Sequence, residues 1–320
     1  MKPASLFPLS EQEQALVTLG RVLRDREYSF ITPTPATHAI VNAREGSRHA
    51  KSVTDVFGWS RPFHPEALPD EIAQLAARAG IVEETATGAR STVRFSTLNG
   101  LLFIHSAFPT TRPDAVFFGP DTYRFARALK SAAREPCQRT MRVVDIGCGS
   151  GAGGIYVGHM LQGRCDVDLV LGDINPQALR FARINAALNE CETTIVHSDI
   201  LRDIDGPADL IIANPPYLID AARRAYRHGG GDYGGALSIR IVEESIPRLE
   251  RGGRLILYTG SAVVHGVDTF RRDVQPVLLR CRLAYDYEEI DPDVFGEELH
   301  DGPYRNAERI SVVALTIRKE

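Results

Sequence analysis

Apolar residues in the first third of the chain recur at the spacing of helices. Between residues 11 and 25 they come at steps of three and four, which predicts a helix, and Ser10 before them is a typical N-cap residue. Residues 69–79 show the same spacing and predict a second helix. Residues 93–97 alternate instead, and Asn99-Gly100 behind them is a strong two-residue turn signal, so we expect a β-hairpin after the helices.

After residue 115 the pattern changes to short apolar runs that alternate with amphipathic segments. The apolar runs are strand candidates and lie at 141–145, 167–171, 194–197, 209–213 and 254–259. Helical spacing returns between them, at 178–188 and 238–249. Apolar strands that alternate with helices predict a parallel sheet with helices on both faces. Two later strands, 282–288 and 309–317, have no long helix between them and therefore predict an antiparallel edge.

The length and composition are those of a globular protein with two domains. The chain has 320 residues, and at roughly 150 residues per domain we expect one unit over 1–114 and a second over 115–320. Hydrophobic residues make up 43% and charged residues 24%, which excludes a disordered, collagen-like or coiled-coil chain. The first unit has the order of a winged helix, but we interpret it as a substrate-recognition or lid domain.

The net charge bears on which class of substrate we expect. It is −4, whereas a protein that neutralises a phosphate backbone is usually basic. Residues 1–114 hold twelve basic and twelve acidic side chains, so the first unit is neutral. We therefore expect a small-molecule or protein substrate rather than a nucleic acid.

Neither the cysteines nor the N-terminal residues indicate export. The five cysteines are scattered and lack a CxxC pair, so we expect no disulfide framework and no metal site. The first residues lack the apolar core of a signal peptide, and no apolar run reaches the roughly 20 residues that span a bilayer. We predict a cytoplasmic protein that does not enter a membrane.

A glycine-rich loop follows the first predicted strand of the second unit. The strand ends at Asp145, and Gly147, Cys148, Gly149 and Gly151 form the loop before a helix begins. Glycine removes the side chain and permits positive φ, so a ligand can approach the backbone closely. Ligands bind beyond the carboxyl ends of the strands in such sheets. The loop also satisfies the GxGxxG pattern of dinucleotide sites, which is weak evidence alone.

Acidic residues end the next two strands. Asp173, with Ile174 after it, can accept hydrogen bonds from the hydroxyls of a ribose, while Asn175-Pro176 starts the next helix. Asp199 can accept a hydrogen bond from an adenine amine, and Ile200 can cover the ring. The alternatives are a helix cap for Asp173 and a solvated turn for Asp199.

The sequence Asn214-Pro215-Pro216-Tyr217 ends the fourth predicted strand. Two prolines there cannot continue the ladder and fix a rigid turn. The side-chain carbonyl of Asn214 and the backbone carbonyl of Pro215 would accept two hydrogen bonds from one planar NH2 group, and Tyr217 offers a flat face for stacking. Two acceptors localise the lone pair of the nitrogen. We therefore predict catalytic roles for Asn214, Pro215 and Tyr217.

In order and spacing these motifs resemble class I S-adenosylmethionine-dependent methyltransferases, and more narrowly the branch that contains the release-factor glutamine methyltransferases. The resemblance covers roughly residues 115–318. It implies an α/β, Rossmann-like fold with a seven-stranded sheet of order 3-2-1-4-5-7-6, strand seven antiparallel, behind a smaller N-terminal α+β domain. It also implies S-adenosylmethionine as the cofactor, bound by the residues above and by Asn214.

The segment before the first strand of the sheet carries part of the resemblance. Residues 117–129 are similar to the segment that closes over the methionine end of the cofactor in this branch, which implies that Tyr123 lies near the substrate. The glutamine enzymes carry Arg-Pro-Asp-Thr-Glu there, whereas this chain has Gly119-Pro-Asp-Thr-Tyr123. The changed flanks argue against glutamine specificity.

Further substrate contacts are expected after the proline turn. Tyr226, Arg227 and His228 are the candidates, with a solvated loop as the alternative. The glycine cluster at 229–235 is interpreted as a substrate gate beside them.

The sequence therefore predicts methyl transfer from S-adenosylmethionine to a planar nitrogen of a small molecule. Methylation of a protein glutamine or of an RNA or DNA base amine is the first alternative. A non-catalytic regulator that binds S-adenosylmethionine is a further one, although such a protein would not need an acceptor turn. An NAD-dependent dehydrogenase is disfavoured because the proline turn supplies neither a catalytic base nor a nicotinamide pocket.

Overall fold

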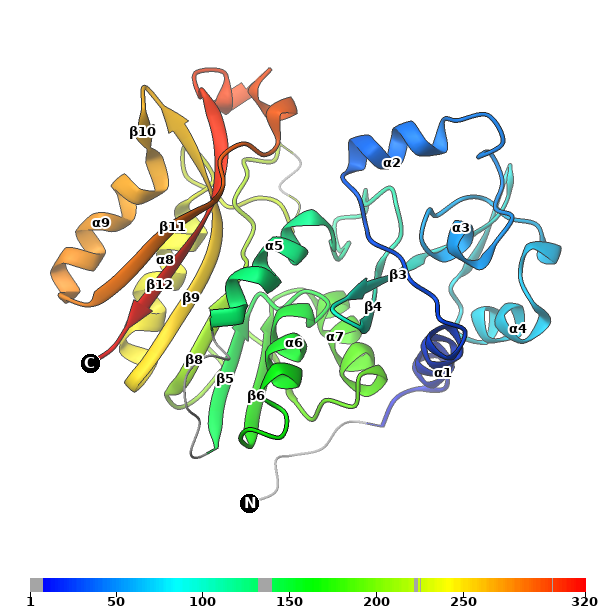
Figure 1. Ribbon diagram of the computed structural model, residues 1–320, viewed down its shortest axis with the longest axis horizontal. Coiled ribbons are helices and arrows are strands. Elements are labelled where there is room, and N and C mark those ends of the chain that lie inside the picture. Colours follow the sequence, from blue (N-terminus) through cyan, green and yellow to red (C-terminus); the bar gives the residue numbers. More distant parts are fainter. Residues whose placement is uncertain (1–7, 132–139, 222–223, 225, 301) are drawn as a thin grey trace.

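A mixed sheet forms the centre of the computed structural model, which describes residues 8–131, 140–221, 224, 226–300 and 302–320 (Figure 1). Its strands follow the order β11-β12-β9-β8-β5-β6-β7. Their bounds are β5 (Met141–Ile146), β6 (Val167–Asp173), β7 (Thr194–His197), β8 (Ala208–Ala213), β9 (Leu249–Val264), β11 (Ala284–Asp291) and β12 (Arg309–Arg318). In chain order this is 3-2-1-4-5-7-6, so the predicted fold class is confirmed.

The antiparallel edge of the sheet is also confirmed. The last strand, β12, runs antiparallel to β9 and to β11, while the strands from β9 to β7 are parallel to one another. A two-residue strand, β10 (Val267–Asp268), folds back on the end of β9. Between β11 and β12 the described residues form only the short 3-10 helices η4 (Gly296–Leu299) and η5 (Gly302–Tyr304).

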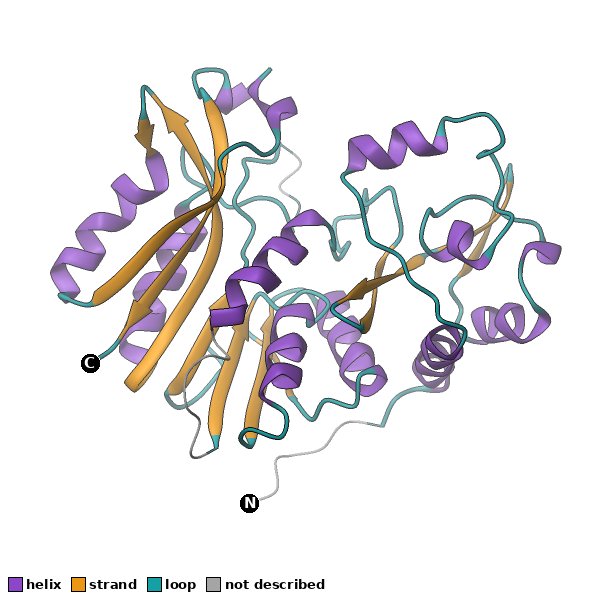
Figure 2. Cartoon of the chain, viewed as in Figure 1, coloured by secondary structure: helices purple, strands orange, loops and turns teal. Residues whose placement is uncertain are grey.

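Helices cover both faces of the sheet (Figure 2). Successive strand residues point to opposite faces, so Val143 packs into one buried cluster and Val144 into another. The first cluster includes α5 (Pro120–Leu129), α6 (Ala152–Leu161) and α7 (Pro176–Leu188), and the second includes α8 (Ala236–Ser245) and α9 (Thr269–Cys281). Helix α9 was missed in the sequence because Pro276 lies inside it and interrupts the helical signal.

The N-terminal part consists of helices followed by two hairpins. It contains α1 (Glu11–Asp25), α2 (Pro35–Asn42), α3 (Val53–Phe57), the 3-10 helix η1 (Pro65–Ala67) and α4 (Asp70–Arg78). The hairpins are β1 (Val82–Thr85) with β2 (Gly88–Ser91), and β3 (Val93–Leu98) with β4 (Leu101–Ser106). The second is the predicted one, and its turn residues Asn99 and Gly100 both have positive φ. The first was not predicted, and the winged-helix order stays an interpretation.

The N-terminal part is not packed separately from the sheet. Leu16, Leu19 and Leu23 of α1 belong to one buried cluster with Phe181 and Leu188 of α7. Helix α1 can approach α7 closely because Gly20 has no side chain; a Cβ there would lie 2.7 Å from Leu188. The predicted boundary at residue 114 therefore divides a chain whose two sides share a core.

Two further observations bear on the expectations for the whole chain. Cys148, Cys191 and Cys281 are free, as expected, but Cys165 is disulfide-bonded, which was not predicted. Among the residues that the structure describes, no helix is long and apolar enough to cross a membrane.

One buried carboxylate ties α1 to α7. Glu13 is 4% exposed and accepts hydrogen bonds from the backbone N–H of Ser10 at 2.9 Å and from Arg183 at 2.5 Å. Burial raises the pKa of Glu13, but the Ser10 N–H and the Arg183 guanidinium outweigh it, and the net pKa is lowered. The ionised form therefore stabilises the fold.

We predict that Glu13→Ala lowers the free energy of unfolding by about 2 kcal/mol, because it leaves charged donors without an acceptor. The pKa of Glu13 is lower in the folded state, so this contribution is present above the ordinary glutamate pKa and disappears as the pH falls through the folded-state value. Urea unfolding at pH 7 and pH 3 measures both effects. Glu11→Ala, at an exposed position of the same turn, is the control. An equal effect of both substitutions would contradict the prediction.

Candidate functional site

A cavity of about 580 Å³ opens at the carboxyl ends of β5, β6 and β8. It is lined by the start of α2 and by residues 115–117, 120–122, 124–125, 145–150, 152–153, 173–175, 198–200, 214–218, 226–227, 293–295 and 297, among others. Such a volume is typical of small-ligand sites. The cavity gathers most of the residues that the sequence analysis singled out.

The glycine-rich loop forms one wall of this cavity. Gly147 and Gly149 have positive φ and line it, and a Cβ at Gly147 would meet no atom within 4 Å. Cys148 lies between them, and burial raises the pKa of its thiol, so the group is uncharged. Gly151, which was also predicted as a cofactor contact, does not line the cavity. It is the N-cap of α6 with φ of 79°, and its close neighbours are Ile155, Leu171 of β6 and Ala182 of α7.

Asp145 lines the cavity but its carboxylate is turned to the loop. Its Oδ2 accepts the backbone N–H of Gly154 at 2.8 Å, which holds the start of α6 against β5. Burial raises the pKa of Asp145 to about 7. The hydrogen bond of Asp145 therefore fixes the start of α6, beside the glycine-rich loop.

Asp173 joins two loops at the cavity. Its Oδ2 accepts the N–H of Gly149 at 2.9 Å and its Oδ1 accepts the N–H of Asn175 at 2.8 Å. Burial raises its pKa. Asn175 caps α7, as the sequence predicted, by accepting the N–H of Gln177. Each carboxylate oxygen of Asp173 keeps acceptor capacity toward the cavity, because a carboxylate has about four acceptor positions.

The next predicted cofactor contacts, Ile174, Ile200 and Asp199, lie in different surroundings. Ile174 lines the cavity and is 56% exposed, which is unusual for a large aliphatic side chain. Ile200 also lines the cavity, but it is buried and has a positive φ. Asp199 also lines the cavity, but its carboxylate forms ion pairs at 3.3 Å with Arg202 and Arg240. An adenine amine would share this carboxylate with two guanidinium groups.

The proline turn forms another part of the cavity wall. Asn214, Pro215 and Tyr217 all line the cavity. Within the described part of the chain, no hydrogen bond is formed by the Asn214 side chain. Tyr217 is 7% exposed, and its ring packs edge-on against Tyr258 and Phe295 at centroid distances of 6.3 and 6.1 Å. Burial, and then the neighbouring Asp121 carboxyl, raise the pKa of Tyr217, so its hydroxyl stays protonated.

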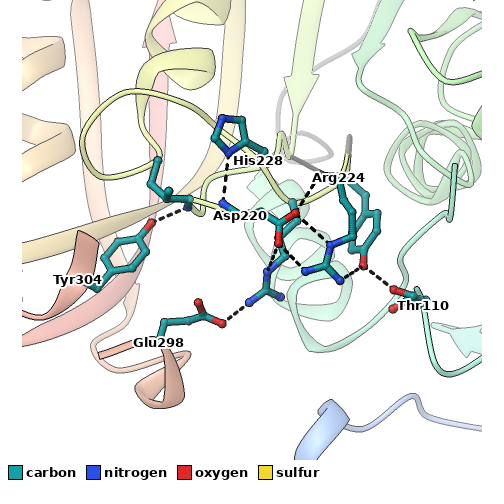
Figure 3. Close-up of polar contacts among 9 residues, drawn as sticks. Thr110, Asp220, Arg224, His228, Glu298 and Tyr304 are labelled. Atoms are coloured by element: carbon teal, nitrogen blue, oxygen red, sulfur yellow. Dashed lines mark hydrogen bonds and ion pairs between the residues drawn. The ribbon is translucent and has the colours of Figure 1, made fainter. Parts of the chain in front are cut away.

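The four predicted substrate contacts divide into two pairs. Tyr226 and Arg227 line the cavity. Tyr123 does not, because its hydroxyl accepts the N–H of Thr32 and its ring packs on Phe118. His228 does not either, because its Nδ1 accepts the N–H of Asp220 at 3.2 Å (Figure 3). The structure therefore does not bring Tyr123 and His228 into the cavity, and both side chains hold other segments.

Asp220 holds the cavity-lining loop that follows the proline turn. It is 6% exposed, and its carboxylate accepts the backbone N–H of Arg224 at 2.8 Å and Nε of the same residue at 3.0 Å (Figure 3). These bonds lower the pKa of Asp220 to about 2. Arg224 in turn donates to the hydroxyl of Tyr226, which donates to the carbonyl of Thr110 at 2.6 Å.

Arg227 completes this polar network at the rim. Its Nε lies 3.7 Å from Asp220, and its Nη2 forms an ion pair with Glu298 of η4. The network therefore connects the segment after β8 with residue 110 on one side and with the C-terminal 3-10 helix on the other (Figure 3). Sequence reasoning missed Asp220, whose four-residue spacing to Arg224 was the available signal.

Sequence reasoning also missed the contribution of the N-terminal part. Thr34, Pro35 and Ala36, at the start of α2, line the cavity. Asp121 of α5 lines it as well, and accepts a hydrogen bond from Tyr258 at 3.0 Å. The Pro-Asp-Thr sequence was a signal for Asp121. No local signal pointed to α2, which reaches the cavity only through the tertiary fold.

We predict that Asp220→Ala destabilises the protein by about 2 kcal/mol, because it removes the acceptor of several charged hydrogen bonds. The pKa of Asp220 is about 2 in the folded state, so its contribution is present above the ordinary aspartate pKa and is lost as the pH falls toward 2. Urea unfolding at pH 7 and pH 3 measures the loss. Asp232→Ala, at an exposed position nearby, is the control and should change stability by less than about 0.5 kcal/mol. A wild-type stability for Asp220→Ala would contradict the prediction.

Comparison with known proteins identifies the domain that holds the cavity. Residues 125–263 match the model of the methyltransferase small domain. A release factor glutamine methyltransferase from Deinococcus radiodurans is 29% identical over 167 residues, which cover 49% of this chain and 55% of that protein. A ribosomal RNA small subunit methyltransferase C from Pasteurella multocida is 37% identical over 86 residues, 26% of this chain and 25% of that protein.

A solved methyltransferase structure from Pyrococcus furiosus covers 64% of this chain and 88% of its own, with a TM-score of 0.43 and 18% identity. The chain spans about half the length, or less, of the curated relatives named above.

These relatives correct one expectation. The sequence analysis ranked nucleic acid below small-molecule and protein substrates because of the net charge. That ranking is wrong, because the relatives of this domain include several ribosomal RNA methyltransferases. Net charge sums over the whole surface and does not report on the surroundings of the cavity. Residues 125–263, which match the model of the methyltransferase small domain, hold both the glycine-rich loop and the proline turn, and both segments line one cavity.

Proposed function

We propose that this protein transfers the methyl group of S-adenosylmethionine to a planar NH2 nitrogen, and that the acceptor is the exocyclic amine of a base in RNA. The observation that carries the proposal is the position of Asn214. Its amide lies at the carboxyl end of β8, in one cavity with the glycine-rich loop, and forms no hydrogen bond with the described residues. A polar side chain that lines a cavity without a partner is available to a ligand.

The cofactor half of the cavity fits a nucleoside. Gly147 and Gly149 let a ligand approach the backbone, and Asp173 keeps acceptor positions that suit ribose hydroxyls. The exposed face of Ile174 offers an apolar surface for a base ring. Asp199 would accept a bond from the base amine while it keeps its arginine partners. When bound, S-adenosylmethionine would supply an electrophilic methyl group.

The proline turn would prepare the acceptor. The side-chain oxygen of Asn214 and the carbonyl of Pro215 would each accept one hydrogen from the NH2 group, and this localises the lone pair of the nitrogen. Tyr217 limits the position of the planar group from the side, because its own ring is fixed by Tyr258 and Phe295. Rate enhancement of this kind comes mainly from alignment. The proton can leave the nitrogen after the transfer.

The surroundings of the cavity mouth favour RNA. Helix α2 begins at the cavity, and the loop that follows it exposes Arg44, Arg48 and Lys51 with one acidic residue, Glu45, among them. Exposed cations near a site suit a phosphate backbone. Relatives of the same domain are named as ribosomal RNA methyltransferases, which supports this choice.

A protein glutamine is the second candidate. It is favoured by the release factor glutamine methyltransferase relative, which matches 49% of this chain. A glutamine side chain ends in the same planar NH2 group, so the proline turn would hold it in the same way.

We predict that Asp173→Ala weakens the binding of S-adenosylhomocysteine roughly tenfold to a hundredfold, because charged hydrogen bonds to the ribose would be lost. Isothermal titration calorimetry measures the affinity. Asp203→Ala, which alters an exposed carboxylate close to the Asp199 loop, should leave the affinity unchanged. Unchanged affinity for Asp173→Ala would remove the cofactor assignment.

We predict that Asn214→Ala retains binding of S-adenosylhomocysteine but transfers methyl groups roughly a hundredfold more slowly, because the acceptor is no longer aligned. The assay incubates the enzyme with labelled S-adenosylmethionine and with separated RNA, protein and small-molecule fractions of cells. Label in RNA supports the proposal, and label in protein supports the second candidate. A protein that binds the cofactor and labels no fraction would be a regulator, and full activity of Asn214→Ala would overturn the role of the turn.

A further inference from the structure

We propose that Gly229 and Gly234 are positioning residues that fix the proline turn from behind, so that the segment 229–235 is a support for the acceptor carbonyl and not a gate. This inference rests on the proposed function, because it concerns the acceptor half of that site. Its starting point is the close packing of the glycine segment against the backbone of the turn.

Gly229 lies directly against the turn. A Cβ at this position would lie 2.6 Å from the carbonyl oxygen of Pro216 and 2.8 Å from Cα of Tyr217. It would also lie 2.0 Å from the carbonyl oxygen of Gly234. Atoms in contact normally stay about 3.5 Å or more apart, so any side chain at Gly229 has to displace main-chain atoms.

Gly234 presses on the next peptide of the same turn. A Cβ there would lie 2.0 Å from the carbonyl oxygen of Tyr217 and 3.0 Å from the amide nitrogen of Leu218. Its φ is +85°, a conformation that favours glycine. The peptide that follows Tyr217 thus has a fixed wall behind it.

The segment is itself anchored. The N–H of Gly229 donates to the carbonyl of Leu218 at 2.8 Å, and the carbonyl of Gly229 accepts the N–H of Leu237 in α8 at 2.9 Å. The ring of Tyr217 is supported from another side by Gly260 of β9, where a Cβ would lie 2.2 Å from the ring. The turn is therefore held between α8 and β9.

The packing of the glycine segment also affects the position of the Pro215 carbonyl. Proline fixes φ at positions 215 and 216, so a shift of the peptide after Tyr217 is passed back along a stiff chain. A misplacement of about 1 Å in an acceptor site reduces a rate roughly a hundredfold. The glycine segment would then set the alignment of the acceptor, while the cofactor half of the cavity lies on other loops.

The test compares Gly234→Ala with Gly230→Ala. Gly230 also has positive φ, of +74°, but among the described residues a Cβ there meets only Ala236 at 3.7 Å, so this variant carries the backbone strain without touching the turn. Gly260→Ala is a second variant, which moves the turn through the ring of Tyr217. For each protein, the crystal structure, the thermal unfolding midpoint, the affinity for S-adenosylhomocysteine and the methyl-transfer kcat and KM are measured.

We expect Gly234→Ala to shift the Pro215 carbonyl and to lower kcat roughly a hundredfold, with affinity for S-adenosylhomocysteine retained. Gly230→Ala should be destabilised to a similar degree but should keep both the turn geometry and kcat. Equal kcat for the two variants, or an unmoved carbonyl in Gly234→Ala, would overturn the inference. If Gly234→Ala does not fold, Gly260→Ala decides in the same way. If no acceptor is labelled by the wild type, the proposed function fails, and the crystal structures alone still decide this inference.

Discussion

Three parallel strands, β5, β6 and β8, end at one edge of the sheet, and this constraint places the whole site. The pairing sets Gly172 of β6 and Ala213 of β8 level with the last residue of β5. The residues that follow, Gly147, Asp173 and Asn214, therefore leave the sheet together although they are far apart in the chain. The buried apolar strands stabilise the sheet, and its edge is where polar groups can reach a ligand.

Backbone N–H groups at this edge need hydrogen-bond acceptors even before a ligand binds, and the carboxylates are these acceptors. Asp145, Asp173 and Asp220 each accept at least one main-chain N–H. A buried carboxylate without a partner would be costly, so these bonds compensate for burial and at the same time fix the loops that line the cavity. The result is a preformed cavity in which the amide of Asn214 keeps its hydrogen-bonding capacity for the acceptor.

The sequence predicted those elements whose conformation depends on residues that are close in the chain. The helix that begins after Ser10, the Asn99-Gly100 turn and the proline turn at residue 214 depend on neighbours in sequence, and all three are present. The side chains of Tyr123 and His228 lie outside the cavity because tertiary contacts, to Thr32 and to Asp220, determine their direction. The approach of α2 to the cavity likewise depends on tertiary contacts and not on the local sequence. Sequence alone places a residue on an element, but packing decides which way it turns.

The net charge of the chain is likewise a poor predictor of the class of methyl acceptor. A total of −4 describes the average surface, and electrostatic attraction between exposed charges falls off within about 10 Å at moderate salt. Under the proposed function, a phosphate of the RNA would meet the exposed Arg44, Arg48 and Lys51 on the loop that follows α2. A protein with a net negative charge can therefore carry a locally basic loop. In this proposal the N-terminal part, which is neutral as a whole, would contribute to RNA binding through that loop.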